Sequence, residues 1–397
     1  MLMLPFAMSE LNVIVLGKDL HAVLDVLPQI FLVTLLGYFS VAVGGSLWRL
    51  KAGIGLRKAA TKLLDIIPDC SLMVMSSRGI LVFQSLLCLL AQFVIVASYF
   101  AHSGFGFDLR GYTFENPIIR PIALIISNYS IVIASHCLAR YIDHKERILL
   151  ECTICLTLGL IFFGSRANLL LIYLNILICY LIMLRARLGL LRMLVLIVFF
   201  MGFGLYLGNV RAGEYSLSSF FTSFAVLFLY GDTFSDLRDF AWVYSAWDHV
   251  HWWGRTYLAA LTAFVPRFAS QFRDTWGMGV VTASTVGFDP QVHPGLRPGM
   301  FGESYFNFGL VGVVCMGLLL GIILRRVDLD VKAALLTSRP SMMRAFAFTN
   351  LLAIAASIAV SAGFSSVYVL AGVYALSWFF LLLQRLFYPS RLAARSS

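Results

Sequence analysis

Long apolar runs separated by short charged segments dominate the sequence. A helix needs about 20 apolar residues to cross a bilayer core of about 30 Å. Nine runs have this character, at residues 27–48, 79–101, 117–139, 148–164, 167–184, 188–209, 303–324, 345–361 and 363–384. The first 20 residues leave room for a tenth, short span. The pattern predicts an all-α, polytopic integral membrane protein with about 9–10 transmembrane helices, in one membrane domain over residues 1–397.

The composition agrees with this fold class. Hydrophobic residues make up 60% of the 397-residue chain and charged residues 13%. Soluble domains contain about 45–50% and about 25% of these classes. Residues 1–19 lack a basic start and a small-residue cleavage site, so we predict no cleaved signal peptide.

The distribution of Lys and Arg predicts the orientation of the chain. Basic segments occur at residues 49–62, 140–147, 185–187 and 325–332 and after Gln384, and nine spans place all of them on one side. Short cytoplasmic loops carry such an excess, so this side is predicted to be cytoplasmic. The connection 210–302 is then a long periplasmic loop. We attribute the net charge of +10 to the basic segments that set the orientation of the chain in the membrane. No nucleic-acid partner is therefore expected.

The predicted outer face carries arginine and hardly any lysine. The connection 210–302 has no lysine, and its arginines are Arg211, Arg238, Arg255, Arg267, Arg273 and Arg297. Guanidinium groups bind phosphate and carboxylate through two parallel hydrogen bonds, which favours an anionic ligand at this face. The alternative is that these side chains pair with acids of the same loop, such as Asp239 and Asp274.

Arg166 stands at a position that favours an anion. The segment "GSRAN" precedes a predicted span, and Ser165 is a plausible N-cap for that helix. A cation in a first helical turn opposes the helix dipole, and a bound anion would offset that cost. The alternative is an arginine that reaches up to the lipid headgroups.

Aromatic and metal-binding residue types give less specific signals. Five of the seven tryptophans lie in the long connection, namely Trp242, Trp247, Trp252, Trp253 and Trp276. They suit packing against sugar faces or a belt at the membrane interface. The same connection holds His249, His251 and His293 but no HExxH or Cys/His ligand set, so we predict no metal and no cofactor. None of the seven cysteines lies there, so no disulfide is expected in it.

Four short motifs resemble the Wzy-type polymerases of O-antigen and related oligosaccharide repeat units. They are "GSR" at 164–166, "RD" at 238–239, "WGRTYLAALTAFVPR" at 253–267 and "PGMFGESYFNFGLVG" at 298–312. The resemblance covers about residues 160–325 and implies a GT-C-like glycosyltransferase in the bacterial inner membrane. Its substrate would be an undecaprenyl-diphosphate-linked oligosaccharide, joined to the next unit at the periplasmic face. Further partners implied are membrane lipids, a chain-length regulator and a flippase.

The candidate site residues follow from this chemistry. Glu303 stands where the long connection meets an apolar run, and Glu303 or Asp239 can take a proton from an acceptor hydroxyl. The alternative for Glu303 is a structural role, in which the dipole of a helix that begins there stabilises the carboxylate. The candidate ligands of the substrate and its diphosphate are Arg166, Arg211, Arg238, Arg255, Arg267, Arg297 and His293.

Two other functions fit parts of this pattern. An O-antigen ligase would use the same donor but transfer the glycan to lipid A core. A flippase or transporter would keep ionisable groups near the middle of the bilayer. The predicted spans contain Asn128, Asn175 and Asn350 in their interiors while the charges gather outside, which favours surface chemistry over transport.

The predicted orientation can be tested with reporter fusions. A reporter that is active only in the periplasm should work when fused after Gly231 or Phe288. The same reporter should be inactive after Lys145 or Lys332, because the basic segments hold these positions inside. The reverse pattern of activity would invert the topology and remove the basis for an outer active face.

Overall fold

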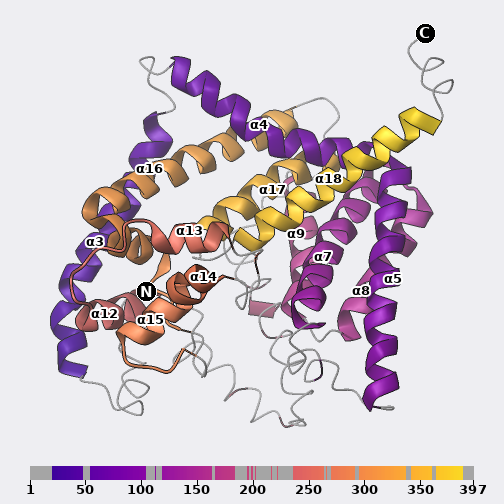
Figure 1. The fold of residues 1–397 in the computed structure, drawn as a ribbon. Coiled ribbons are helices and arrows are strands. Elements are labelled where there is room, and N and C mark those ends of the chain that lie inside the picture. The colour runs from indigo at the N-terminus through magenta and orange to yellow at the C-terminus, as the bar shows by residue number, and fades with distance from the viewer. Residues whose placement is uncertain are drawn as a thin grey trace. The chain divides into compact units, whose positions relative to one another are not determined.

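The computed structural model is helical and contains no strand in any part of the chain that it describes (Figure 1). It describes residues 20–47, 54–103, 112, 119–162, 166–183, 195, 198–199, 202, 216, 221, 236–262, 265, 270–290, 295–336, 341–359 and 364–387. The helices are α3 (Leu20–Leu47), α4 (Ile54–Ser76), α5 (Arg78–Ser103), α7 (Ile119–His144), α8 (Arg147–Phe162), α9 (Arg166–Met183), α12 (Asp236–Ala246), α13 (Arg255–Leu261), α14 (Gln271–Trp276), α15 (Met278–Thr285), α16 (Gly299–Leu336), α17 (Met342–Ala359) and α18 (Phe364–Phe387).

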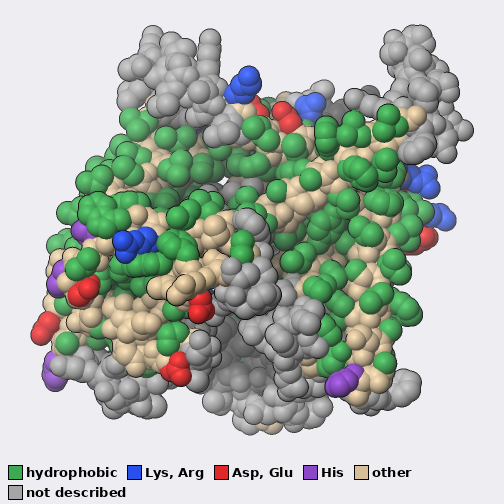
Figure 2. Space-filling model, viewed as in Figure 1, with side chains coloured by type: hydrophobic (Ala, Val, Ile, Leu, Met, Phe, Trp, Pro, Cys, Tyr) green, Lys and Arg blue, Asp and Glu red, His purple; other side chains and the backbone are tan. Residues whose placement is uncertain are grey.

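Four of the described helices are long and apolar enough to cross a membrane. They provide the stretches His21–Leu47, Arg78–His102, Ile122–His144 and Gly299–Ala334. Hydrophobic side chains cover much of α5, α16, α17 and α18 on the face drawn in Figure 2. The structure therefore confirms an all-α fold and indicates a multi-pass membrane protein. The predicted span at 188–209 lies almost entirely outside the described residues.

Two regions that we interpreted as connections contain helices. The basic segment 49–62 runs into α4, which begins at Ile54, and the long connection 210–302 contains α12 to α15. These helices are not long continuous apolar runs, so a search for membrane spans does not detect them.

The chain divides into two compact units. The first unit comprises Met1–Ala60, Leu205–Arg326 and Leu352–Ser365. The second comprises Thr61–Gly204, Val327–Leu351 and Ser366–Ser397. The first unit contains α3, α12 to α15 and most of α16, and the candidate acid Glu303 lies in it.

Glycines allow α3 and α16 to pack closely within the first unit. A Cβ atom built on Gly317 of α16 would lie 2.7 Å from the carbonyl oxygen of Gly37 in α3. A Cβ atom on Gly321 would overlap the carbonyl oxygen of Val41. Small residues that let two backbones approach are a common means of helix association in membranes, where burial from water contributes little. The contact fixes α16 laterally and so holds the helix that carries Glu303.

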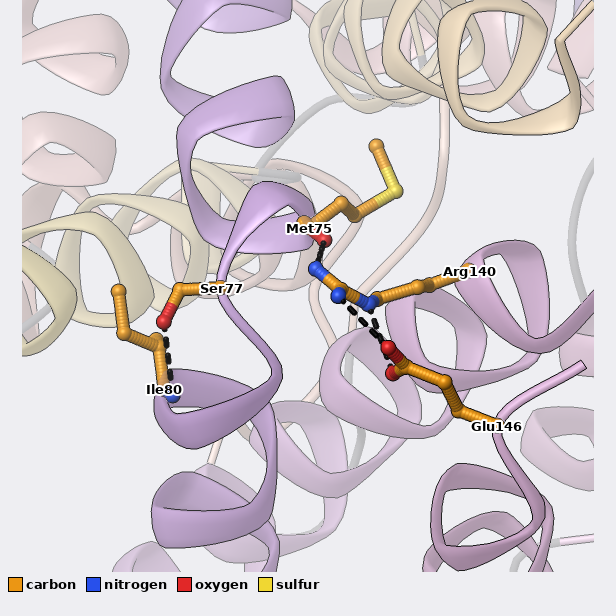
Figure 3. A network of polar contacts seen from close by, with 5 residues as sticks. All are labelled: Met75, Ser77, Ile80, Arg140 and Glu146. Atoms are coloured by element: carbon orange, nitrogen blue, oxygen red, sulfur yellow. Dashed lines mark hydrogen bonds and ion pairs between the residues drawn. The ribbon is translucent and has the colours of Figure 1, made fainter. Parts of the chain in front are cut away.

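The second unit is held by a buried arginine at the turn between α7 and α8. Arg140 Nε and Nη2 donate to the two carboxylate oxygens of Glu146 at 3.0 and 2.9 Å. Arg140 Nη1 also donates to the carbonyl oxygen of Met75 near the end of α4 (Figure 3). The hydrogen bonds from Arg140 lower the pKa of the Glu146 carboxyl below its ordinary value. The basic segment 140–147 therefore has a structural role in the second unit.

The same turn also caps α17. The carboxylate of Asp143 accepts the backbone N–H groups of Met342 and Met343, each at 2.9 Å, and the hydroxyl of Ser341 at 2.7 Å. A carboxylate at a helix start satisfies backbone donors that have no partner within the helix. Asp143 and Arg140 together tie α4, α7, α8 and α17 into one unit.

The glycine contact between α3 and α16 predicts a difference between two Gly→Ala variants. Gly321→Ala should lower the free energy of unfolding by about 1–3 kcal/mol, because its Cβ meets backbone atoms of α3 that cannot move aside cheaply. Gly45→Ala is the control, since its Cβ would lie 3.6 Å from the nearest atom, Gly321 O, which is ordinary contact. Thermal unfolding in detergent measures the difference. Equal unfolding temperatures of the two variants would show that this contact does not constrain the helices.

Candidate functional site

The helix α16 is broken at Gly309, and the break creates the site. Gly309 has φ 63° and ψ −153°, a conformation open to glycine because it has no Cβ. The carbonyl oxygens before the break accept hydrogen bonds from another segment. Phe306 O accepts the N–H of Trp252 at 2.9 Å, and Asn307 O accepts that of Trp253 at 3.2 Å. The loop before α13 thus replaces bonds that a continuous helix would make to itself.

The side chain of Asn307 extends this contact. Its Oδ1 accepts the backbone N–H of Gly254 at 2.8 Å, which fixes the orientation of the amide. Its Nδ2 donates to Thr256 Oγ1 at 2.7 Å and to the carbonyl oxygen of Glu303 at 2.9 Å. One buried amide therefore holds the loop, α13 and α16 together.

Glu303 lies at the centre of this network. Its side chain is almost completely buried, with the residue only 2% exposed. Thr256 Oγ1 donates to Glu303 Oε1 at 2.9 Å. Because Thr256 Oγ1 already accepts from Asn307, its single hydroxyl hydrogen is directed at the carboxylate. The acid is held in one position by a chain of two hydrogen bonds.

A second polar pair lies next to this chain. Tyr257 and Ser304 follow Thr256 and Glu303 in sequence, and their hydroxyl oxygens are 2.9 Å apart. Burial, and next the charge of the Glu303 carboxylate, raise the pKa of the Tyr257 phenol above its ordinary value. The phenol is therefore a neutral hydrogen-bonding group beside the acid at physiological pH.

Aromatic side chains close the site on the side of α12. Phe306 is completely buried and packs against Phe240 and Trp247, with ring centroids 5.3 and 5.2 Å apart, and against Trp252 at 4.8 Å. Trp242, Trp247 and Trp252 are buried. These three form a core around α16 and do not line the membrane interface, contrary to the belt that the sequence suggested. Trp253, in contrast, is 70% exposed.

The "RD" motif forms a separate cluster at the start of α16. Arg238 and Asp239 are both buried, and Arg238 Nη2 lies 2.7 Å from Asp239 Oδ1. Asp239 Oδ2 accepts the backbone N–H of Arg297 at 3.1 Å. The carboxylate of Asp239 is thus engaged by the chain itself. A buried pair of this kind fixes the approach of residues 295–298 to α12.

Asp236 stands beside the first residue of α16. A Cβ atom on Gly299 would lie 3.1 Å from Asp236 Oδ2. Although solvent reaches Asp236, the protein around its carboxyl and next the charge of Asp239 raise its pKa, whereas Arg297 opposes the shift. The chain therefore supplies its own acid at this helix start. The charge of the exposed Arg297 acts on that acid.

Arg255 is the candidate arginine that lies nearest in sequence to the Glu303 network. It is exposed at the start of α13, and its guanidinium carbon lies 4.5 Å from the centre of the Trp276 ring. A guanidinium that stacks on an indole keeps its N–H edge free to bind an anion. Since Thr256 is the next residue, Arg255 and the acid Glu303 lie at the same end of α13.

The structure thus brings the predicted residues into two groups. Glu303 of α16 contacts Thr256 of α13, which directly follows Arg255, whereas Arg238, Asp239 and Arg297 lie near the start of α16. Arg166 is the first residue of α9, and its side chain lies outside the described parts of the chain. Arg211, Arg267 and His293 also lie outside them. No group of three or more His, Cys, Asp or Glu side chains in the described segments is arranged to hold a metal ion.

Sequence reasoning missed the residues that position the acid. Asn307 follows Glu303 by four residues, so both lie on one face of the helix, and Thr256 directly follows Arg255. The first spacing is readable from the sequence. The contact with Thr256 is not, because it depends on the helix break at Gly309.

The role of Asn307 can be tested by comparing two Asn→Ala variants. Asn307→Ala leaves the Gly254 N–H without its acceptor and removes the bond that Thr256 Oγ1 accepts, although Thr256 still donates to Glu303. The unsatisfied Gly254 N–H should cost about 1–3 kcal/mol. The loop 251–254 should then be cut more readily by protease. Asn128→Ala is the control, because Asn128 bonds to Leu124 O within its own helix. Equal protease resistance of both variants would contradict the proposed anchoring.

Comparison with protein-family models, with curated proteins and with solved structures found no match to this chain.

Proposed function

We propose that this protein is a glycosyltransferase that polymerises lipid-diphosphate-linked oligosaccharide repeat units, with Glu303 as the general base. The observation that carries the proposal is the buried carboxylate of Glu303, oriented by Thr256 and Asn307 at a broken membrane helix. The motifs that resemble the Wzy-type polymerases include these three residues. The predicted topology places them at the periplasmic face of a bacterial inner membrane.

The chemistry follows from the carboxylate of Glu303 on α16 and the guanidinium of Arg255 on α13. An acceptor hydroxyl attacks the anomeric carbon of the donor glycan, and its proton passes to the Glu303 carboxylate. The bond between that carbon and the lipid diphosphate breaks, and the diphosphate leaves with the bonding electron pair. Negative charge on the leaving group increases in the transition state. The guanidinium of Arg255, fixed over Trp276, is suited to stabilise it.

The orientation of the acid favours this role over that of an ordinary helix-start residue. An acid that merely interacts with a helix dipole is usually exposed, and the effect falls off within the first turn. Glu303 is buried and is the fifth residue of α16. Burial of a carboxylate is costly unless hydrogen bonds compensate for lost water, so its position requires the support of Thr256.

Transport is a second candidate, favoured by one observation in the second unit. His136 is completely buried near the middle of the stretch Ile122–His144. Its Nε2 lies 2.8 Å from Ser71 Oγ, and Asn350 Nδ2 donates to the same hydroxyl at 2.7 Å. Ionisable groups inside membrane helices often mark a transport route. However, His136 Nδ1 lies 2.6 Å from Val132 O, so a neutral ring satisfies all these contacts, as in ordinary helix packing.

The variant Glu303→Gln tests the proposal. Gln keeps the size of the side chain and an oxygen that can accept from Thr256, but it cannot take up a proton. We expect the rate of polymerisation to fall by about 10² to 10⁴, so that surface polysaccharide carries mostly single repeat units. The measurement is the ladder of chain lengths in a strain that expresses the variant as its sole copy, with membrane abundance and thermal stability measured in parallel.

Glu151→Gln is the matched control, because Glu151 is exposed on α8. It should leave the ladder unchanged. A full ladder with stable Glu303→Gln would contradict the proposed base. In a strain without the protein, complete chains that never reach the lipid A core would indicate a ligase, and repeat units retained on the cytoplasmic side would indicate a transporter.

A further inference from the structure

An apolar surface extends from α16 onto the loop and helix that precede it. The surface, here called the α13 surface, comprises Trp253, Leu258, Leu261, Phe308, Leu310 and Val311, all of which are exposed. Phe308 links α16 to the loop and to α13. The ring of Phe308 stacks on that of Tyr257 with centroids 6.2 Å apart, and a Cβ on Gly254 would lie 2.9 Å from Phe308 Cζ.

The two faces of α13 differ in character. Thr256, Ala259 and Ala260 are buried against the rest of the first unit. Leu258 and Leu261 point outward and are 52% and 49% exposed. A helix whose outer face faced water would normally carry polar residues there. The outer face of α13 is therefore suited to an apolar environment.

The backbone holds Trp253 outward. Trp253 has φ 52°, a left-handed conformation that is unfavourable for a residue with a bulky side chain. Asn307 stabilises it, because the N–H groups of Trp253 and Gly254 both bond to Asn307. The neighbouring Trp252 is buried, whereas the indole of Trp253 is exposed. The chain thus retains a strained residue whose indole packs away from the core.

Lipid is the occupant that continuity favours. Leu310 and Val311, which complete the α13 surface, lie in the stretch Gly299–Ala334 of α16, which is long and apolar enough to cross a bilayer. Their exposed side chains face the hydrocarbon if α16 spans the membrane. A protein surface that is continuous with lipid-facing residues lies at a similar depth in the membrane. Tryptophan is enriched at the membrane–water interface, because its ring is apolar and its N–H is polar.

We infer that the α13 surface is inserted into the bilayer interface, so that α13 lies on the membrane with its leucines in lipid and Thr256 directed at Glu303. This arrangement places the Glu303 network at the depth of the lipid headgroups. Arg255, on the same short helix, then lies at the level of lipid phosphates. The inference goes beyond the proposed reaction, because it concerns where the site sits and not what is transferred.

Quenching of tryptophan fluorescence by brominated lipid tests the insertion. The purified full-length protein is placed in vesicles of phosphatidylcholine, with or without bromine on acyl carbons near the glycerol. Trp253→Phe should lose part of the lipid-quenched emission relative to the unmodified chain. Trp252→Phe is the matched control and should lose emission that the brominated lipid does not quench, since Trp252 is buried. The exposed Trp378 contributes equally to all three proteins.

Iodide, present on both sides of the vesicles, provides the opposing measurement. If the inference is correct, Trp253→Phe changes the iodide-quenched emission little, because the indole lies in lipid. If Trp253→Phe instead removes iodide-quenched emission and leaves the lipid-quenched part unchanged, the surface faces water and the inference is wrong. The measurement needs no enzymatic activity, so its outcome is independent of the Glu303→Gln test.

Discussion

The helix break at Gly309 is the constraint on which the candidate site depends. A continuous helix would use the carbonyl oxygens of Phe306 and Asn307 for its own ladder. In this chain they instead accept N–H groups from Trp252 and Trp253. The loop is therefore bound to α16 through main-chain hydrogen bonds, which do not depend on flexible side chains. The hydrogen bond from Thr256 to the acid Glu303 depends on this placement of the loop against the helix.

Three kinds of packing support the break. Glycines on α16 allow α3 to approach it closely, buried aromatic rings around Phe306 fill the side toward α12, and Asn307 joins the loop to the helix. An unsatisfied backbone group in an apolar environment is costly, so irregular backbone at membrane depth requires such cover by protein. The first unit supplies that cover locally, which explains why several polar residues are tolerated beside a candidate membrane span.

The sequence predicted the helical class and the position of the acid better than it predicted the environment of that acid. Apolar runs locate α3, α5, α7 and α16 because span length is a direct consequence of bilayer thickness. Glu303 was conspicuous as an acid next to such a run. The short helices α12 to α15 were missed, and three tryptophans assigned to sugar contacts or an interface are core residues. These features depend on contacts between segments about 50 residues apart, and the spacing of hydrophobic residues along the sequence does not reveal such contacts.

Glu303 and His136 show how two buried ionisable side chains differ in what they can do. His136 lies within a helix bundle, and the Ser71 hydroxyl and the Val132 carbonyl engage its two ring nitrogens. A neutral ring in that setting has its hydrogen-bonding capacity filled and acts as a packing element. Glu303 is oriented through Thr256, and the neighbouring Arg255 on the same helix turn is exposed. The acid is thus oriented by a residue that directly follows a solvent-facing cation in sequence, and this combination is why the first unit carries the stronger case for chemistry.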